Sequence, residues 1–258
     1  MVYMELFFYV FIFIFGLMIG SFLNCLIWRL YKEETVLGRS YCPKCGKELK
    51  WYDNIPVFSF IFLKGRCRFC DERISWQYPL VELITGLLFT LSYYLALNNN
   101  FTFLELFFYF FIISLSVIIF VFDLRWYLIP ISTVIVGGLT VIAINLFLGA
   151  SILNIFISML IGAAFFGVQY VVTRGKGLGE GDIWLGALFG AIFPDIKMLI
   201  LTIFLTYIIG GVTAVILLVF KLKSVGSKLP LGIFLALALI ISLFFGSDII
   251  NWYFSLIF

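Results

Sequence analysis

A series of long apolar runs, separated by short polar connectors, constrains this chain more than any other feature. The first run, residues 4–28, is interrupted only by Glu5 and Asn24. A helix needs about 20 apolar residues to cross a hydrocarbon core of about 30 Å. Seven further runs cover residues 79–97, 103–122, 130–148, 152–172, 183–193, 196–220 and 229–246. The sequence therefore predicts an all-α polytopic membrane protein with about eight transmembrane helices.

The composition agrees with this class and limits the chemistry. Hydrophobic residues make up 64% of the chain and charged residues 12%, against about 45–50% and about 25% in soluble domains. Histidine is absent, which excludes Ser-His and Cys-His catalysis and leaves carboxylates and thiolates. The aromatic residues lie in the apolar runs and not on a basic face, so we expect no nucleic-acid partner.

The basic residues predict how the chain is oriented. Residues 29–77 form the only long polar segment and hold ten of the 17 Lys and Arg residues. An excess of basic residues marks a loop of this length as cytoplasmic, so the N-terminus is expected outside. The start is acidic and the run is long, which favours a retained first span over a signal peptide. Alternating through eight spans then places the C-terminus outside and Asp123 and Asp182 at the cytoplasmic face.

Two Cys-x-x-Cys pairs lie in the polar segment, Cys42 with Cys45 and Cys67 with Cys70. Four thiolates in this pattern suit a tetrahedral structural zinc ion, and a short segment with little apolar content gains stability from a metal. Two disulfides are the alternative, although a cytoplasmic loop is reducing; a redox role and free thiols are the others. Cys25 lies inside the first run, and we expect it to be a small buried residue. The chain is thus expected to divide into a first helix (1–28), a cytoplasmic zinc-binding domain (29–78) and a transmembrane domain (79–258).

Two acids each lie next to an apolar run. Asp123 follows residues 106–122, and Asp182 ends the segment Gly177-Leu178-Gly179-Glu180-Gly181-Asp182. An acid at the edge of a hydrocarbon layer is costly and marks a functional site by default. Gly179 and Gly181 let the backbone approach another group closely. The sequence therefore predicts an aspartyl protease site, in which one ionised carboxylate activates water and a protonated one donates to the peptide.

Each acid also has a structural interpretation. Asp182 precedes the run 183–193 and suits an N-cap, and Asp123 suits an interfacial helix end near Arg125. That run would measure about 17 Å as a helix, too short to cross unless the glycine loop is drawn into the protein. Glu82 is expected to be structural, paired with a basic residue of the polar segment, or else to touch substrate; Glu180 is expected on a solvated loop. Two more acids, Asp195 and Asp248, are expected on the outer side.

Together these residues resemble the bacterial type IV prepilin peptidase family, bifunctional GxGD-type aspartyl proteases and N-methyltransferases. The resemblance covers roughly residues 16–238. It is carried by Gly20-Ser21-Phe22-Leu23-Asn24 with Arg29, both cysteine pairs, Asp53-Asn54-Ile55-Pro56, Gly65-Arg66-Cys67-Arg68, Ile74-Ser75, Tyr78-Pro79-Leu80-Val81-Glu82, Asp123-Leu124, Ile129-Pro130, Gly179-Glu180-Gly181-Asp182, Leu229-Pro230-Leu231-Gly232 and Phe234-Leu235-Ala236. One departure is Leu231-Gly232-Ile233, where many relatives have Phe-Gly-Pro.

The resemblance implies a function. Family members sit in the bacterial inner membrane, cut the basic leader from type IV prepilins and secretion pseudopilins at the cytoplasmic face, and methylate the new N-terminus with S-adenosylmethionine. Asp123 and Asp182 match the catalytic aspartates, and the four cysteines match those of the cytoplasmic domain. The polar segment is too short for a Rossmann unit, so the S-adenosylmethionine site is unknown. Three alternatives are a presenilin-type protease with other substrates, an ion- or proton-coupled transporter and a non-catalytic zinc-ribbon adaptor.

Overall fold

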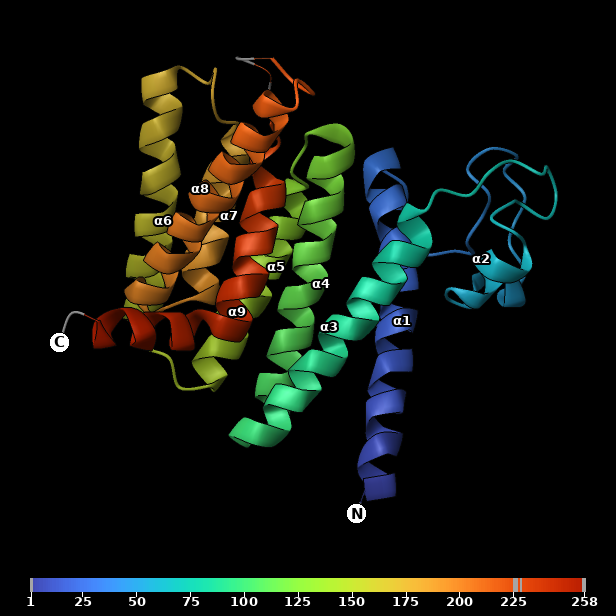
Figure 1. Cartoon of the computed structure of the whole chain (residues 1–258), viewed down its shortest axis with the longest axis horizontal. Coiled ribbons are helices and arrows are strands. Elements are labelled where there is room, and N and C mark those ends of the chain that lie inside the picture. Colours follow the sequence, from blue (N-terminus) through green and yellow to red (C-terminus); the bar gives the residue numbers. More distant parts are fainter. Residues whose placement is uncertain (1, 225–226, 228, 257–258) are drawn as a thin grey trace. The chain divides into compact units, whose positions relative to one another are not determined.

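The computed structural model describes residues 2–224, 227 and 229–256. In this part of the chain the regular structure is helical, with two isolated bridges between Tyr41 and Glu48 and between Arg66 and Arg73 (Figure 1). The elements are α1 (Val2–Lys32), the 3-10 helix η1 (Trp51–Asn54), α2 (Phe58–Phe62), α3 (Gln77–Asn99), α4 (Phe103–Trp126), α5 (Ile131–Phe147), α6 (Ile152–Thr173), α7 (Glu180–Ile192), α8 (Ile196–Val219) and α9 (Leu231–Ser255).

A helix is present at each of the eight predicted apolar runs, which confirms the all-helical polytopic class. Six of these helices, α1, α3, α4, α6, α8 and α9, are long and apolar enough to cross a membrane. Helix α5 is a shorter apolar helix of 17 residues, and α7 has only 13. These two short helices contact each other.

The chain divides into two compact units, Met1–Val117 and Ile118–Phe258, with the boundary inside α4. The limits predicted at residues 28 and 78 remain a prediction, and the outer ends of those segments, residues 1 and 257–258, lie outside the described part. In the first unit α1 packs on α3 through glycines. A Cβ at Gly16 would lie 2.7 Å from the Cα of Gly86, and one at Gly20 would lie 2.7 Å from the Cα of Glu82. Small residues permit this close approach of two membrane helices.

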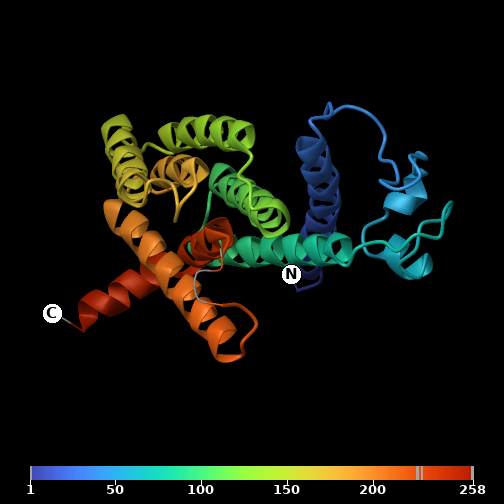
Figure 2. The ribbon, with the colours of Figure 1, turned by 90° about the horizontal axis from the view of Figure 1, so that it is seen from above.

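Helix α7 is the centre of the second unit. It contacts α5, α6, α8 and α9, and Figure 2 shows it surrounded by α5, α6 and α8. Its backbone touches that of α6: a Cβ at Gly186 would lie 2.3 Å from the carbonyl oxygen of Gly162, and one at Gly190 would lie 2.2 Å from that of Ser158. Eight residues of α7 are buried: Asp182, Leu185, Gly186, Leu188, Phe189, Gly190, Ala191 and Ile192.

Side chains of neighbouring helices donate hydrogen bonds to the carbonyl groups at the end of α7. The carboxamide of Asn145 on α5 donates to the carbonyl of Ala191 at 2.7 Å, and the hydroxyl of Ser158 on α6 donates to that of Pro194 at 2.9 Å. The last carbonyls of a helix have no partner within it, and leaving them unpaired in an apolar environment is costly. A helix too short to cross the membrane is therefore accommodated inside the bundle.

Candidate active site and metal centre

Asp123 lies in the last turn of α4 and contacts the first turn of α9. Its side chain is buried, and its Oδ2 accepts a hydrogen bond of 3.0 Å from the backbone N–H of Ile233. Gly232 makes this contact sterically feasible, because a Cβ there would lie only 2.8 Å from the same oxygen. The carboxylate thus faces the N-terminus of a helix, an end that favours negative charge. In the sequence, Gly232 was singled out only as part of the resemblance, and its contact with Asp123 was not predicted.

Asp182 lies in the first turn of α7. The N-cap of this helix is Gly179, and the Asp182 carboxylate accepts a hydrogen bond of 2.9 Å from the N–H of that glycine. The structural alternative, in which Asp182 is the N-cap of a helix that starts at residue 183, is therefore wrong: Asp182 is the third residue of the helix. The helix begins at Glu180, after bends at residues 176–178 and the extended residue Gly179, and the side chain of Asp182 folds back to bind the cap.

The two carboxylates lie close enough to each other for their charges to interact. Ile129, in the connector after α4, packs on Gly181, where a Cβ would lie 2.9 Å from the Cβ of Ile129. Asp123 and Asp182 are 5% and 6% exposed, and they interact electrostatically. Three helix ends, those of α4, α7 and α9, thus bring two shielded acids together. Such a pair can place one charged and one protonated carboxyl on the same substrate, because two like charges in one site disfavour each other.

Two of the other acids, Asp195 and Glu180, form hydrogen bonds near helix N-termini. Asp195 caps α8 by accepting a hydrogen bond of 3.0 Å from the N–H of Lys197, and Asp248 lies in α9. Glu180 was expected on a loop but is the first residue of α7. It accepts a hydrogen bond of 3.0 Å from the hydroxyl of Tyr170.

Glu82, on α3, is buried and accepts a hydrogen bond of 2.7 Å from the backbone N–H of Val57. None of the ion pairs found among the described residues includes Glu82, so the expected pairing with a basic residue is wrong, whereas the hydrogen bond fits the expected structural role. Val57 has a φ of 62°, which is unusual for a β-branched residue. The carboxylate therefore stabilises a strained backbone position next to α2.

The two cysteine pairs form one cluster. The sulfur atoms of Cys42, Cys45, Cys67 and Cys70 all lie within 4.8 Å of one another, and those of Cys42 and Cys70 are 3.9 Å apart. Sulfurs placed 2.3 Å from a tetrahedral zinc ion would be about 3.8 Å apart. A disulfide requires about 2.05 Å, and all five cysteines are free thiols. The donors therefore fit a four-thiolate metal site.

The backbone around the two pairs repeats itself. The N–H of Cys42 donates to the carbonyl of Lys47 at 3.0 Å, and that of Cys67 donates to Glu72 at 2.8 Å. Both turns then use a left-handed residue, Gly46 with a φ of 70° in the first and Asp71 with a φ of 58° in the second. Each pair is thus one copy of the same knuckle.

One thiol of the cluster ionises readily. Burial raises the pKa of Cys67, but hydrogen bonds from the backbone N–H groups of Phe69 and Cys70 and from neighbouring sulfurs outweigh burial and lower it to about 7. A thiolate is the form that binds a metal. The carboxylate of Asp53, which is buried between the knuckles, forms an ion pair of 2.7 Å with Arg68 and so links the second knuckle to η1.

Two family models match consecutive parts of the chain. Residues 14–96 match the family model of the bacterial peptidase A24 N-terminal domain, and residues 109–215 match that of the type IV leader peptidase family. No solved structure gives a significant match.

Three similar proteins are each named prepilin leader peptidase/N-methyltransferase. That of Bacillus subtilis is 33% identical over 94% of this chain and 96% of its own length. That of Legionella pneumophila is 31% identical over 96% and 94%. That of Myxococcus xanthus is 40% identical over 71% of this chain, which spans 56% of that longer protein. The chain belongs to the type IV leader peptidase family.

Proposed function

We propose that Asp123 and Asp182 are the acid pair with which this membrane enzyme removes the leader peptide of type IV prepilins, before it methylates the new N-terminus. The observation that carries the proposal is the convergence of two buried, interacting carboxylates at three helix ends. Each acid forms its hydrogen bond with a backbone N–H and not with a basic side chain, so no positive charge neutralises either carboxylate.

The geometry supports acid–base hydrolysis. One ionised carboxylate takes a proton from a water molecule, whose oxygen attacks the carbonyl carbon of the scissile peptide. The other carboxyl, kept protonated by its charged neighbour, donates its proton to the carbonyl oxygen. The first carboxyl then passes the proton that it took from water to the leaving amine, and the second regains a proton from the gem-diol as the C–N bond breaks. Burial excludes bulk water and strengthens both interactions.

Orientation and substrates are the finer part of the proposal. The excess of basic residues in 29–77 favours a cytoplasmic location for the knuckles and for both aspartates, with the two termini outside. A site at that face meets the substrate where a charged leader joins an apolar segment. The substrate class then includes pseudopilins of protein secretion as well as prepilins of the type IV pilus.

A structural zinc ion is proposed for the cysteine cluster. The four sulfurs of Cys42, Cys45, Cys67 and Cys70 have the spacing that a tetrahedral ion requires, and four thiolates leave no open position for catalysis. The ion would hold the two knuckles together and take no part in peptide hydrolysis.

S-adenosylmethionine is the proposed methyl donor, which supplies an electrophilic methyl group to the new amine. In residues 29–78 the described elements are η1, α2 and two isolated bridges, which do not build a nucleotide-binding βαβ unit. No residue is therefore assigned to this cofactor, and no step is derived through it.

Intact-mass analysis of a full-length prepilin tests the proposal. The purified protein in detergent with S-adenosylmethionine should remove the leader and add one methyl group. Asp182→Asn should leave the substrate uncut, whereas Asp195→Asn should cut it normally, because Asn caps α8 about as well as Asp does. An uncut substrate with the folded wild-type protein would refute the peptidase assignment. Normal cleavage by Asp182→Asn would refute the acid pair.

A further inference from the structure

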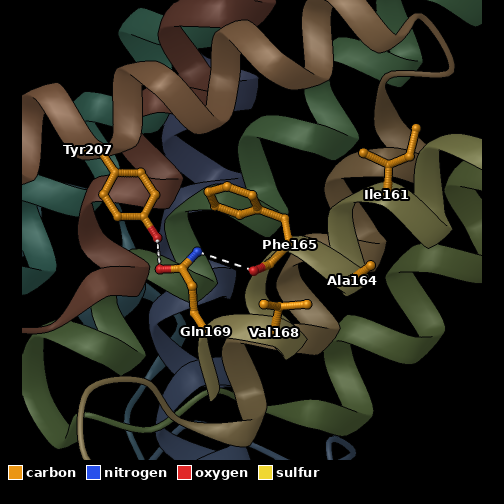
Figure 3. A pocket seen from close by; sticks show the side chains of 6 residues that line it. All are labelled: Ile161, Ala164, Phe165, Val168, Gln169 and Tyr207. Carbon is orange, nitrogen blue, oxygen red and sulfur yellow. Dashed lines mark hydrogen bonds between the residues drawn. The ribbon is translucent and has the colours of Figure 1, made fainter. Parts of the chain in front are cut away.

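An apolar groove of about 650 Å³ runs between α6 and α8 in the second unit (Figure 3). Its walls are Ile161, Ala164, Phe165, Val168 and Gln169 of α6 and Tyr207 of α8. Ala164 has the smallest side chain of the set and lies beside larger ones, so it provides room in the wall. The lining is apolar apart from Gln169 and the hydroxyl of Tyr207.

These two polar groups bind each other across the helices. The hydroxyl of Tyr207 donates to Oε1 of Gln169 at 2.7 Å, and Nε2 of Gln169 donates to the carbonyl of Phe165 at 3.2 Å (Figure 3). A carboxamide has two N–H donors and two acceptor lone pairs, and a phenol also accepts. The pair therefore keeps both donor and acceptor capacity for a further molecule.

The polar pair is at the same end of the bundle as Asp182. Tyr170, which follows Gln169 on α6, donates to Glu180 in the first turn of α7 at 3.0 Å. The charge of Asp182 also acts on Tyr207. A molecule that lies in the groove thus has one end near the acid pair.

The chemistry of this surface selects its occupant. A lipid acyl chain has no group that can form hydrogen bonds with Gln169 and Tyr207. A peptide that is to be hydrolysed must be unwound at the scissile bond, and its freed N–H and C=O groups need partners where water is scarce. We propose, resting on the function above, that the groove receives the apolar segment of the substrate that follows the scissile bond. Gln169 and Tyr207 bind the unwound backbone and position it at Asp182.

Two substitutions test the groove with purified full-length protein and a full-length prepilin. Ala164→Trp fills the wall and should raise KM about tenfold or more, as expected when an apolar contact is lost. Tyr207→Phe should lower kcat/KM about fivefold, the effect of one neutral hydrogen bond. Phe156→Trp, on an exposed part of α6 outside the groove, is the control and should leave both parameters unchanged. Equal kinetics for Ala164→Trp and Phe156→Trp would overturn the proposal.

Photo-crosslinking identifies the occupant directly. A benzoylphenylalanine at position 165, where the groove wall already carries an aromatic side chain, should form an adduct with the prepilin residues that follow the scissile bond when Asp182→Asn prevents cleavage. The same group at position 156 should react with detergent or lipid. Adducts of position 165 with detergent or lipid alone, in the presence of prepilin, would overturn the proposal.

The two proposals fail in distinguishable ways. If Asp182→Asn cleaves normally, the acid pair is wrong whatever the groove does. If the acid pair is confirmed but Ala164→Trp and the crosslinks show no effect of the groove, only the substrate path is wrong.

Discussion

The cysteine cluster and the acid pair are held in place by opposite means. Between residues 33 and 76 only Cys42, Asp53 and Cys67 are buried, so the knuckles have almost no apolar core of their own. Helix α7, by contrast, is buried along most of its length and touches α6 backbone to backbone. The stability of the first region should therefore depend on its metal and that of the second on packing. A substitution should be able to disrupt either region without disrupting the other.

Loss of the metal should have the largest effect. Zinc binding in small metal-dependent domains contributes about 10–16 kcal/mol, so Cys67→Ser should lose the ion and unfold residues 40–74. Leader cleavage should persist because the acid pair does not use the knuckles. Metal analysis, hydrogen exchange of this segment and intact-mass assay measure the three outcomes.

Cys25→Ser is the matched control for the metal. Cys25 lies on α1 outside the cluster, so this variant should keep its zinc and both activities. A Cys67→Ser protein with full zinc occupancy would contradict the four-thiolate site.

Breaking the packing of α7 should have the converse effect. Gly186→Leu cannot fit against Gly162 without separating α6 from α7, and overpacking of this kind costs about 1–3 kcal/mol or more. We expect a lower melting temperature and loss of cleavage with zinc content unchanged. Gly211→Leu is the control, since a Cβ at Gly211 meets nothing within 4 Å; equal stability of the two variants would refute the account of α7.

A smaller change should disturb the acid pair alone. Gly232→Ala places a methyl group 2.8 Å from Oδ2 of Asp123 and must displace that carboxylate. Misplacement of a catalytic group by about 1 Å can lower the rate about 100-fold, so kcat for cleavage should fall by about 10- to 100-fold. Melting temperature and zinc content should stay near those of the wild type. Unchanged kcat would show that Asp123 needs no support from α9.

The smallest effect is expected at Glu82. Glu82→Gln keeps an acceptor for the N–H of Val57 and should alter stability little. Glu82→Ala leaves that N–H unpaired and should cost about 1–3 kcal/mol, seen as faster hydrogen exchange around α2. If Gln destabilises as much as Ala, the charge of Glu82 and not its hydrogen bond is what matters.

Hydropathy predicted where the helices lie, because each long apolar run forms its own helix whatever its neighbours are. The ends were less predictable. Helix α7 begins at Glu180 and not at residue 183, and α9 continues to Ser255, because hydrogen bonds and packing set the ends. The residue at which an apolar run stops does not determine where the helix ends.

The spacing of the four cysteines predicted their cluster, since metal ligands have a short-range signature in the sequence. The supports of the acid pair have none. Gly232 lies more than a hundred residues from Asp123, and the groove of α6 and α8 depends on which helices meet. Such contacts appear only once the helices are packed.

The most direct test of the acid pair compares Asp123→Asn, Asp182→Asn and the double variant by intact-mass assay of a prepilin over long incubations. Two groups that act as one unit give non-additive losses. We predict that each single variant loses essentially all cleavage, that the double variant is no worse, and that all three keep wild-type zinc content and melting temperature. Wild-type cleavage by either single variant, or losses that multiply in the double variant, would contradict a shared site.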